Sequence, residues 1–151
     1  MLTAKEIMTK EVITVAPETN IVEAVQLLLE KRVNGLPVVD GQGQVKGIIC
    51  QSDLIAQQEK FPIPPFITLL DGFIPLASYK NLEKEVKKIA AVSVEEAMTL
   101  NPVTVGPDAG LEEIATLMVS KNIHTLPVVD QGKLVGIIGK EDILRTLIPK
   151  S

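Results

Sequence analysis

The feature that most constrains this chain is an internal repeat. When residues 3–40 are placed over residues 93–130, fourteen of the 38 aligned positions are identical, whereas unrelated sequences of average composition would share about two or three. The identities end in the segment Leu-Pro-Val-Val-Asp, which closes the two aligned stretches at Asp40 and Asp130. Self-similarity of this kind indicates a duplicated structural unit, so the fold is expected to consist of two similar halves.

Both copies predict the same order of elements. The capping boxes Thr3-x-x-Glu6 and Ser93-x-x-Glu96 predict a short helix at the start of each copy. Apolar residues at helical spacing predict a longer amphipathic helix in the middle, and a last helix begins near residue 52 or 141. Strands are predicted at residues 12–15, 36–39 and 45–50 of the first copy and at residues 103–105, 126–129 and 134–138 of the second.

This order predicts an α/β (α+β) fold in which each copy forms a small three-stranded sheet with helices on one face. One such unit buries too little apolar surface to be stable alone. The two copies are therefore expected to pack sheet to sheet about a pseudo-twofold axis, which leaves two clefts where ligands could bind. We expect the first repeat at residues 1–58, a connecting segment at 59–92 and the second repeat at 93–151.

Composition excludes several classes of function. The net charge is −4 and the pI about 5.1, so no general basic field is available for nucleic acid or a membrane surface. Cys50 and His124 are the sole cysteine and histidine, which disfavours a disulfide framework and a zinc site. With no signal peptide, apolar span, phosphate loop or catalytic triad in the pattern, we expect a cytoplasmic protein that is not an enzyme and has no metal.

The connecting segment has a different composition from the two copies. It contains every aromatic residue of the chain, namely Phe61, Phe66, Phe73 and Tyr79. Apolar residues between Tyr79 and Ala91 have helical spacing. Two interpretations stay open from the sequence: a linker whose aromatics pack on the protein's own surface, or an apolar flap that forms a contact with a partner.

The ordered motifs resemble a known family. Met-Thr, Thr-Val-x-Pro, Leu-Pro-Val-Val-Asp, Gly-Ile-Ile and an Asp four residues after the last Ile occur twice in the same order. This set resembles the cystathionine-β-synthase-like (CBS) domain, and two in tandem resemble the CBS pair, or Bateman module. The resemblance covers about residues 3–58 and 93–148. It implies a regulatory homodimer that binds AMP, ADP, ATP or S-adenosylmethionine, senses energy state and signals to an effector protein in trans.

The resemblance also implies site residues, beginning with Asp53 and Asp142. In the family, the Asp of this motif accepts hydrogen bonds from the ribose hydroxyls of an adenosine ligand. A carboxylate has two oxygens that suit a cis-diol, and charge-assisted hydrogen bonds are comparatively strong. The alternative is structural, because an Asp near a helix N-terminus stabilises the helix dipole or caps the helix in both copies alike.

Cys50 and Gly139 depart from the family pattern. Relatives usually have Thr or Ser there, and the hydroxyl helps to hold ribose or phosphate, whereas a thiol is a weak donor and glycine offers only its backbone. The departure favours a second hypothesis for the whole chain, an interaction and dimerisation scaffold whose ligand clefts have degenerated. Cys50 itself is interpreted as a small buried apolar residue rather than a reactive thiol.

The remaining candidates would hold the phosphate and the adenine. His124 and Lys140 are the phosphate candidates, with solvated surface charge as the alternative. The position of His124 holds Asn34 in the first copy, so the two clefts are expected to differ chemically. By family position, the adenine candidates are Val12, Ile13, Thr14, Leu36, Pro37, Val103, Thr104, Leu126 and Pro127. These residues would be core-like with or without a ligand.

Overall fold

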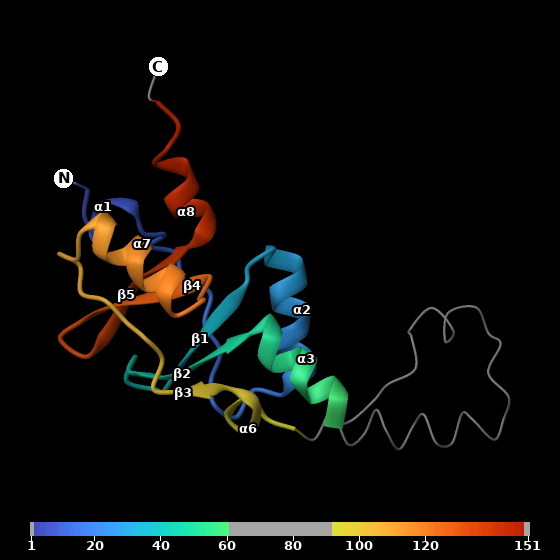
Figure 1. Ribbon diagram of the computed structural model, residues 1–151. Coiled ribbons are helices and arrows are strands. Elements are labelled where there is room, and N and C mark those ends of the chain that lie inside the picture. The colour runs from blue at the N-terminus through green and yellow to red at the C-terminus, as the bar shows by residue number, and fades with distance from the viewer. Residues whose placement is uncertain (1, 61–91, 150–151) are drawn as a thin grey trace, which may run out of the picture.

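The computed structural model describes residues 2–60 and 92–149, so the predicted helix at 79–91 and the four aromatic residues lie outside the described residues. Its helices and central hairpin strands follow one another in the order that the repeat predicts (Figure 1). They are α1 (Ala4–Ile7), α2 (Ile21–Lys31), β1 (Gly35–Val39), β2 (Val45–Cys50), α3 (Gln51–Lys60), α6 (Val94–Ala97), β3 (Thr99–Leu100), α7 (Leu111–Ser120), β4 (Thr125–Asp130), β5 (Lys133–Gly139) and α8 (Lys140–Arg145).

Each copy forms an antiparallel hairpin at its centre, β1 with β2 and β4 with β5. The registers match, since Leu36 lies opposite Ile49 and Leu126 lies opposite Ile138. All four of these side chains are essentially inaccessible to solvent, and each pair belongs to a separate hydrophobic core. The fold class, a mixed α/β (α+β) protein made of two similar units packed sheet to sheet, is therefore confirmed.

The strands predicted at residues 12–15 and 103–105 are wrong. Each segment contributes only one parallel bridge, Val15 to Val38 in the first copy and Val105 to Val128 in the second. Val15 donates its backbone N–H to the carbonyl of Pro37 at 3.1 Å and accepts from Val39 at 3.0 Å. The next bonds along a parallel ladder would need the N–H of Pro17 on one side and of Pro37 on the other, and proline has none.

The third strand of the first sheet comes from the other copy, which corrects the expectation that each copy builds its own. β3 pairs with β2, so Thr99 lies opposite Ile48 although the two belong to different copies. Thr9 makes the corresponding bridge to Ile137 in the second sheet. In Figure 1 the N-terminal α1 accordingly lies with α7 and α8, whereas α6 lies beside β2 and α3.

The opening helices are exchanged together with these strands. Ala4 from the first copy is fully buried in the core around Leu126 and Ile138, and Val94 from the second copy is fully buried in the core around Leu36. The capping box of the first copy forms, since Glu6 accepts from the backbone N–H and the hydroxyl of Thr3, whereas in the second copy only the Ser93 hydroxyl donates to Glu96. We call β1, β2 and β3 with α2, α3 and α6 the first lobe, and β4 and β5 with α1, α7 and α8 the second lobe.

The glycine of each Gly-Ile-Ile motif is where an exchanged segment crosses the sheet. A Cβ atom on Gly47 would lie 2.6 Å from the sulfur of Met98 and 2.8 Å from the carbonyl oxygen of Thr99. Gly136 lies in the same way beneath Met8. The Met-Thr pair and the glycine therefore belong to one contact, made between copies. Within the described ranges, no helix is both long and apolar enough to cross a membrane.

Candidate functional site: two pockets at the seam between the lobes

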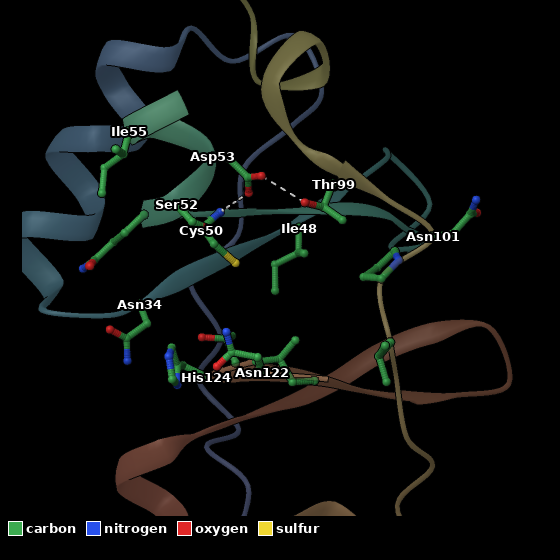
Figure 2. A pocket seen from close by; sticks show the side chains of 15 residues that line it. Asn34, Ile48, Cys50, Ser52, Asp53, Ile55, Thr99, Asn101, Asn122 and His124 are labelled. Atoms are coloured by element: carbon green, nitrogen blue, oxygen red, sulfur yellow. Dashed lines mark hydrogen bonds between the residues drawn. The ribbon is translucent and has the colours of Figure 1, made fainter. Parts of the chain in front are cut away.

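The larger pocket at the seam, here called the Asp53 pocket, has a volume of about 440 Å³. Its walls come from both copies: the end of β2 and the start of α3 on one side, and the segments before β4 on the other. Figure 2 shows Cys50, Asp53 and Thr99 along one wall, with Asn122 and His124 across the cavity from them. Of the predicted site residues, Asp53, Cys50, His124 and Val103 line this pocket.

Asp53 is held in place by two hydrogen bonds. It is the third residue of α3, and its Oδ2 accepts the backbone N–H of Cys50 at 2.8 Å, which satisfies a donor at the helix start. Its Oδ1 accepts the hydroxyl of Thr99 at 3.0 Å, as the dashed lines in Figure 2 show. Asp53 therefore makes the hydrogen bond at the helix start that the structural alternative predicts. Its half-buried carboxylate also faces the pocket.

The second pocket, here called the Asp142 pocket, is the pseudo-symmetric counterpart and has a volume of about 270 Å³. Asp142, Gly139, Ile13 and Leu36 are the predicted site residues that line it. Unlike the Asp53 pocket, it is ringed by charged side chains of both signs. The cations are Lys31, Arg32 and Arg145, and the anions are Glu11, Glu141 and Asp142.

Asp142 has one more partner than Asp53. Its Oδ2 accepts the backbone N–H of Gly139 at 2.7 Å, and its Oδ1 accepts the hydroxyl of Thr9 at 3.2 Å. The same Oδ1 also accepts from Nη1 of Arg145, one turn further along α8, at 2.8 Å. Asp142 is only 9% exposed, so this carboxylate is largely enclosed by the protein's own donors.

Cys50 is half-buried and lines the Asp53 pocket. Burial raises the pKa of Cys50 to about 11, and the negative charge of Asp53 adds to the effect. The thiol is therefore protonated at neutral pH and is a poor nucleophile. Among the residues that the structure describes, no group of three or more His, Cys, Asp or Glu side chains could hold a metal ion.

Several predicted contacts lie away from both pockets. Lys140 is exposed and lines neither pocket. Val12, Thr14 and Thr104 also line neither pocket. Pro37, Leu126 and Pro127 are fully buried in the protein interior. As contacts with an adenine or a phosphate, these residues stay predictions.

Sequence reasoning missed four side chains that define the pockets: Thr9 and Thr99, which bond to the aspartates, and Arg32 and Asn122. The Met-Thr pair is present in both copies, but the sequence does not indicate that its threonine bonds to the aspartate of the other copy. Arg32 and Asn122 follow α2 and α7 at equivalent positions, and both have left-handed backbone, with φ of 54° and 52°. Residues with this backbone commonly end helices, and nothing in the sequence pattern marked their side chains as pocket residues.

Comparison with known proteins establishes the family. The family model of the CBS domain matches residues 4–60 and 94–149, and the chain belongs to this family as a tandem CBS pair. Among curated proteins, an uncharacterized protein of Methanocaldococcus jannaschii is 29% identical over 154 residues, which cover 95% of this chain and 90% of the relative. The chloroplastic CBS domain-containing protein CBSX2 of Arabidopsis thaliana is 32% identical, over 89% of this chain and 58% of its own.

Two solved CBS structures were determined with ligands. CBSX2 in complex with AMP superposes with a TM-score of 0.73 and 30% identity, covering 97% of this chain and 96% of that chain. The CBS domain pair of protein MJ0100, in complex with 5′-methylthioadenosine and S-adenosyl-L-methionine, superposes with a TM-score of 0.70 and 31% identity over 97% and 95% of the two chains. Relatives of this fold therefore include pairs that bind adenosine compounds with and without a phosphate.

Proposed function

We propose that this chain is a regulatory module that binds an adenosine-containing small molecule at the seam between its lobes. The observation that carries the proposal is the position of Asp53 and Asp142: each carboxylate comes from one copy and faces a pocket whose opposite wall comes from the other copy. A ligand that bonds to both walls would fix the relative pose of the lobes. The relatives that bind AMP, or 5′-methylthioadenosine and S-adenosylmethionine, support the choice of adenosine.

The output of the module is proposed to act in trans. The family matches occupy residues 4–60 and 94–149, so most of the chain is devoted to the CBS pair. A change in lobe pose would then have to be detected by a partner protein rather than by a catalytic site in these segments. This makes the chain a binding module and not an enzyme in our proposal.

A homodimer is part of the same proposal. Large apolar side chains are exposed at equivalent positions of the two copies, with Leu29 70% and Val119 83% exposed, and Ile55 71% and Leu144 57% exposed. Apolar side chains repeated by the pseudo-symmetry suit a contact between two copies of the chain. Light scattering during gel filtration tests this directly, and an Ile55→Lys, Leu144→Lys variant is expected to be monomeric if the faces meet in a dimer.

The rival hypothesis, a scaffold with degenerate clefts, also has an observation in its favour. Both aspartates already accept hydroxyl hydrogen bonds from Thr99 or Thr9, so a ribose has to compete with the protein or use the remaining acceptor positions. Under this hypothesis the carboxylates only stabilise the exchanged segments, and no adenosine compound binds.

A thermal-shift panel separates the two hypotheses. The chain is heated with AMP, ADP, ATP, adenosine and S-adenosylmethionine, each tested on the wild type and on Asp53→Asn and Asp142→Asn. Asparagine is chosen because its amide oxygen can still accept the N–H at the helix start. A ligand at 100 times its Kd stabilises by about 2.7 kcal/mol, which is readily measured. Stabilisation that is lost in an Asn variant supports the module, and no shift with any compound favours the scaffold.

A further inference from the structure

The two seam carboxylates differ in the acceptor capacity that they have left. A carboxylate offers about four acceptor positions, two on each oxygen. Asp53 uses one on each oxygen, for Cys50 and Thr99, so one position on each oxygen remains. Asp142 uses both positions of Oδ1, for Thr9 and Arg145, and one of Oδ2. Only Asp53 can therefore receive two neighbouring hydroxyls, one on each oxygen, without displacing a protein donor.

The source of this difference is a single position on the last helix of each copy. Arg145 lies three residues after Asp142 and forms an ion pair with it, whereas Ala56 lies three residues after Asp53. Asp53 is also the more accessible carboxylate, half-buried rather than 9% exposed, and its pocket is the larger of the two. Ribose capture is thus favoured at Asp53.

The charge of the walls then restricts what the ribose can carry. Of the described residues that line the Asp53 pocket, none is a lysine or arginine, and Ile48 and Val103 add apolar side chains to its walls. A phosphate monoester carries a charge of about −1.5 to −2 at neutral pH. Placing that charge near the carboxylate of Asp53, with no lysine or arginine on the described walls to pair with it, is unfavourable. An uncharged or cationic group is not penalised in this way.

The Asp53 pocket has Asn122 at the position where the Asp142 pocket has the cation Arg32. Asn122 occupies the position of Arg32 in the other copy, with the same left-handed backbone, and each of the two residues lines the pocket on its own side. In Figure 2 Asn122 lies across the cavity from Asp53. Because the backbones match, an arginine at this position would place a guanidinium at the Asp53 pocket as Arg32 does at the Asp142 pocket.

We propose that the Asp53 pocket is the principal ligand site and that it selects an adenosine whose 5′ substituent carries no phosphate, such as a thioether or sulfonium group. Asn122 is the specificity-determining residue for this choice. The inference rests on the proposed function, because it assumes that an adenosine compound binds, and it adds both the pocket and the ligand class.

The test is calorimetric titration of the full chain with 5′-methylthioadenosine and with AMP, at pH 8. In the wild type, 5′-methylthioadenosine is expected to bind at least about tenfold more tightly than AMP. Asp53→Asn is expected to weaken the binding of 5′-methylthioadenosine by about tenfold or more, and Asp142→Asn is expected to weaken it by less than about threefold. Asn122→Arg is expected to strengthen AMP binding by about fivefold or more and to leave 5′-methylthioadenosine within about twofold.

The possible failures are distinguishable. Equal or tighter binding of AMP in the wild type, lost in Asp53→Asn, overturns the selection against phosphate. Binding that Asp142→Asn abolishes and Asp53→Asn retains overturns the choice of pocket. If neither compound binds any variant, the proposed function itself fails and the inference falls with it. Should Asp53→Asn not fold, Asn122→Arg still tests the pocket, because Asn122 is exposed and its replacement disturbs no core contact.

Discussion

The hydroxyl of Thr99 donates a 3.0 Å hydrogen bond to Asp53, although the two residues belong to different copies of the repeat and lie 46 positions apart. Thr9 makes the pseudo-symmetric bond to Asp142 at 3.2 Å. The segment that brings each threonine to its aspartate also supplies a strand bridge and a buried helix residue to the opposite lobe. The pocket carboxylates are therefore positioned by the same exchange that joins the two copies.

The first prediction concerns this bond. Thr99→Val keeps the branched shape of the side chain but removes the donor, and it is expected to lower the free energy of unfolding by about 0.5–1.5 kcal/mol. Thr99→Ser keeps the hydroxyl and should lie closer to the wild type than the valine variant. Equilibrium unfolding in urea measures both. Identical stabilities for the valine and serine variants would show that the bond contributes nothing.

The second prediction concerns the crossing of Met98 over Gly47. Gly47→Ala places a methyl group 2.6 Å from the sulfur of Met98 and 2.8 Å from the carbonyl of Thr99, so it is expected to destabilise the protein by about 1–3 kcal/mol. Gly41→Ala is the control, because nothing lies within 4 Å of its added methyl group, and it should stay within about 0.5 kcal/mol of the wild type.

A double variant checks that the cause is the exchanged segment. Gly47→Ala combined with Met98→Ala removes the clash with the sulfur, so the two substitutions are expected to be non-additive by about 0.5–3 kcal/mol, in the favourable direction. Strict additivity of the two unfolding free energies would mean that the crossing methionine is not what makes glycine necessary here.

Much of the fold follows from local pattern. The repeat, the capped helices and both central hairpins were predicted because spacing, caps and turn residues act over a few positions. The exchange was not, for a physical reason: Gly47-Ile48-Ile49 and Gly136-Ile137-Ile138 are the same three residues. A segment such as Thr99–Leu100 finds equivalent edges in both copies, and pattern alone cannot decide which one it pairs with.

The sequence could have predicted that residues 12–15 form a single bridge rather than a strand, because two prolines mark it. Pro17 and Pro37 stand at the two donor positions that a longer ladder beside Val15 would need. The aspartates of the site were found through the family motif, but the difference between them was not. Arg145 lies one turn after Asp142, where a pair at this spacing can form on a helix surface, and Ala56 stands at the matching place in the other copy.

The third prediction concerns the reactivity of Cys50. With its pKa raised to about 11 by burial and by Asp53, about one thiol in a thousand is ionised at pH 8. Alkylation of the folded protein by iodoacetamide is therefore expected to be slow at pH 8 and to accelerate up to about pH 11, and Asp53→Asn should make it faster. The urea-unfolded chain is the reference for an unprotected thiol. Equal rates for the folded and unfolded protein at pH 8 would contradict the assignment.

The same shift has a consequence for stability in alkaline solution. The folded-state pKa of Cys50 lies above the usual value of 9.0 for a cysteine, so the unfolded chain loses its proton first as the pH rises. The contribution is complete below about pH 9 and is lost between about pH 9 and pH 11. Cys50→Ala is expected to show a shallower decline of the unfolding free energy over this window than the wild type.

The last prediction concerns Asp40, in the turn between β1 and β2. The backbone N–H groups of Gln44 and Gln42 donate to Asp40 Oδ1 at 3.0 and 2.9 Å, and Nζ of Lys46 lies 3.6 Å from Oδ2. These partners, Gln44 foremost, hold the pKa of Asp40 below the usual value of 3.8 for an aspartate. Because the folded state binds its proton more weakly than the unfolded chain, this stabilisation is present above about pH 4 and is lost as the pH falls below it.

Asp40→Asn is therefore expected to be less stable than the wild type at pH 7, and the difference should shrink as the pH falls from 4 toward 2. Asp130 closes the equivalent strand of the second copy, and no side-chain hydrogen bond reaches it from the residues that the structure describes, so Asp130→Asn is the matched control and should cost less at pH 7. Urea midpoints of the three proteins across this pH range measure the effect. A difference between wild type and Asp40→Asn that persists unchanged at pH 2 would show that the carboxylate charge is not responsible.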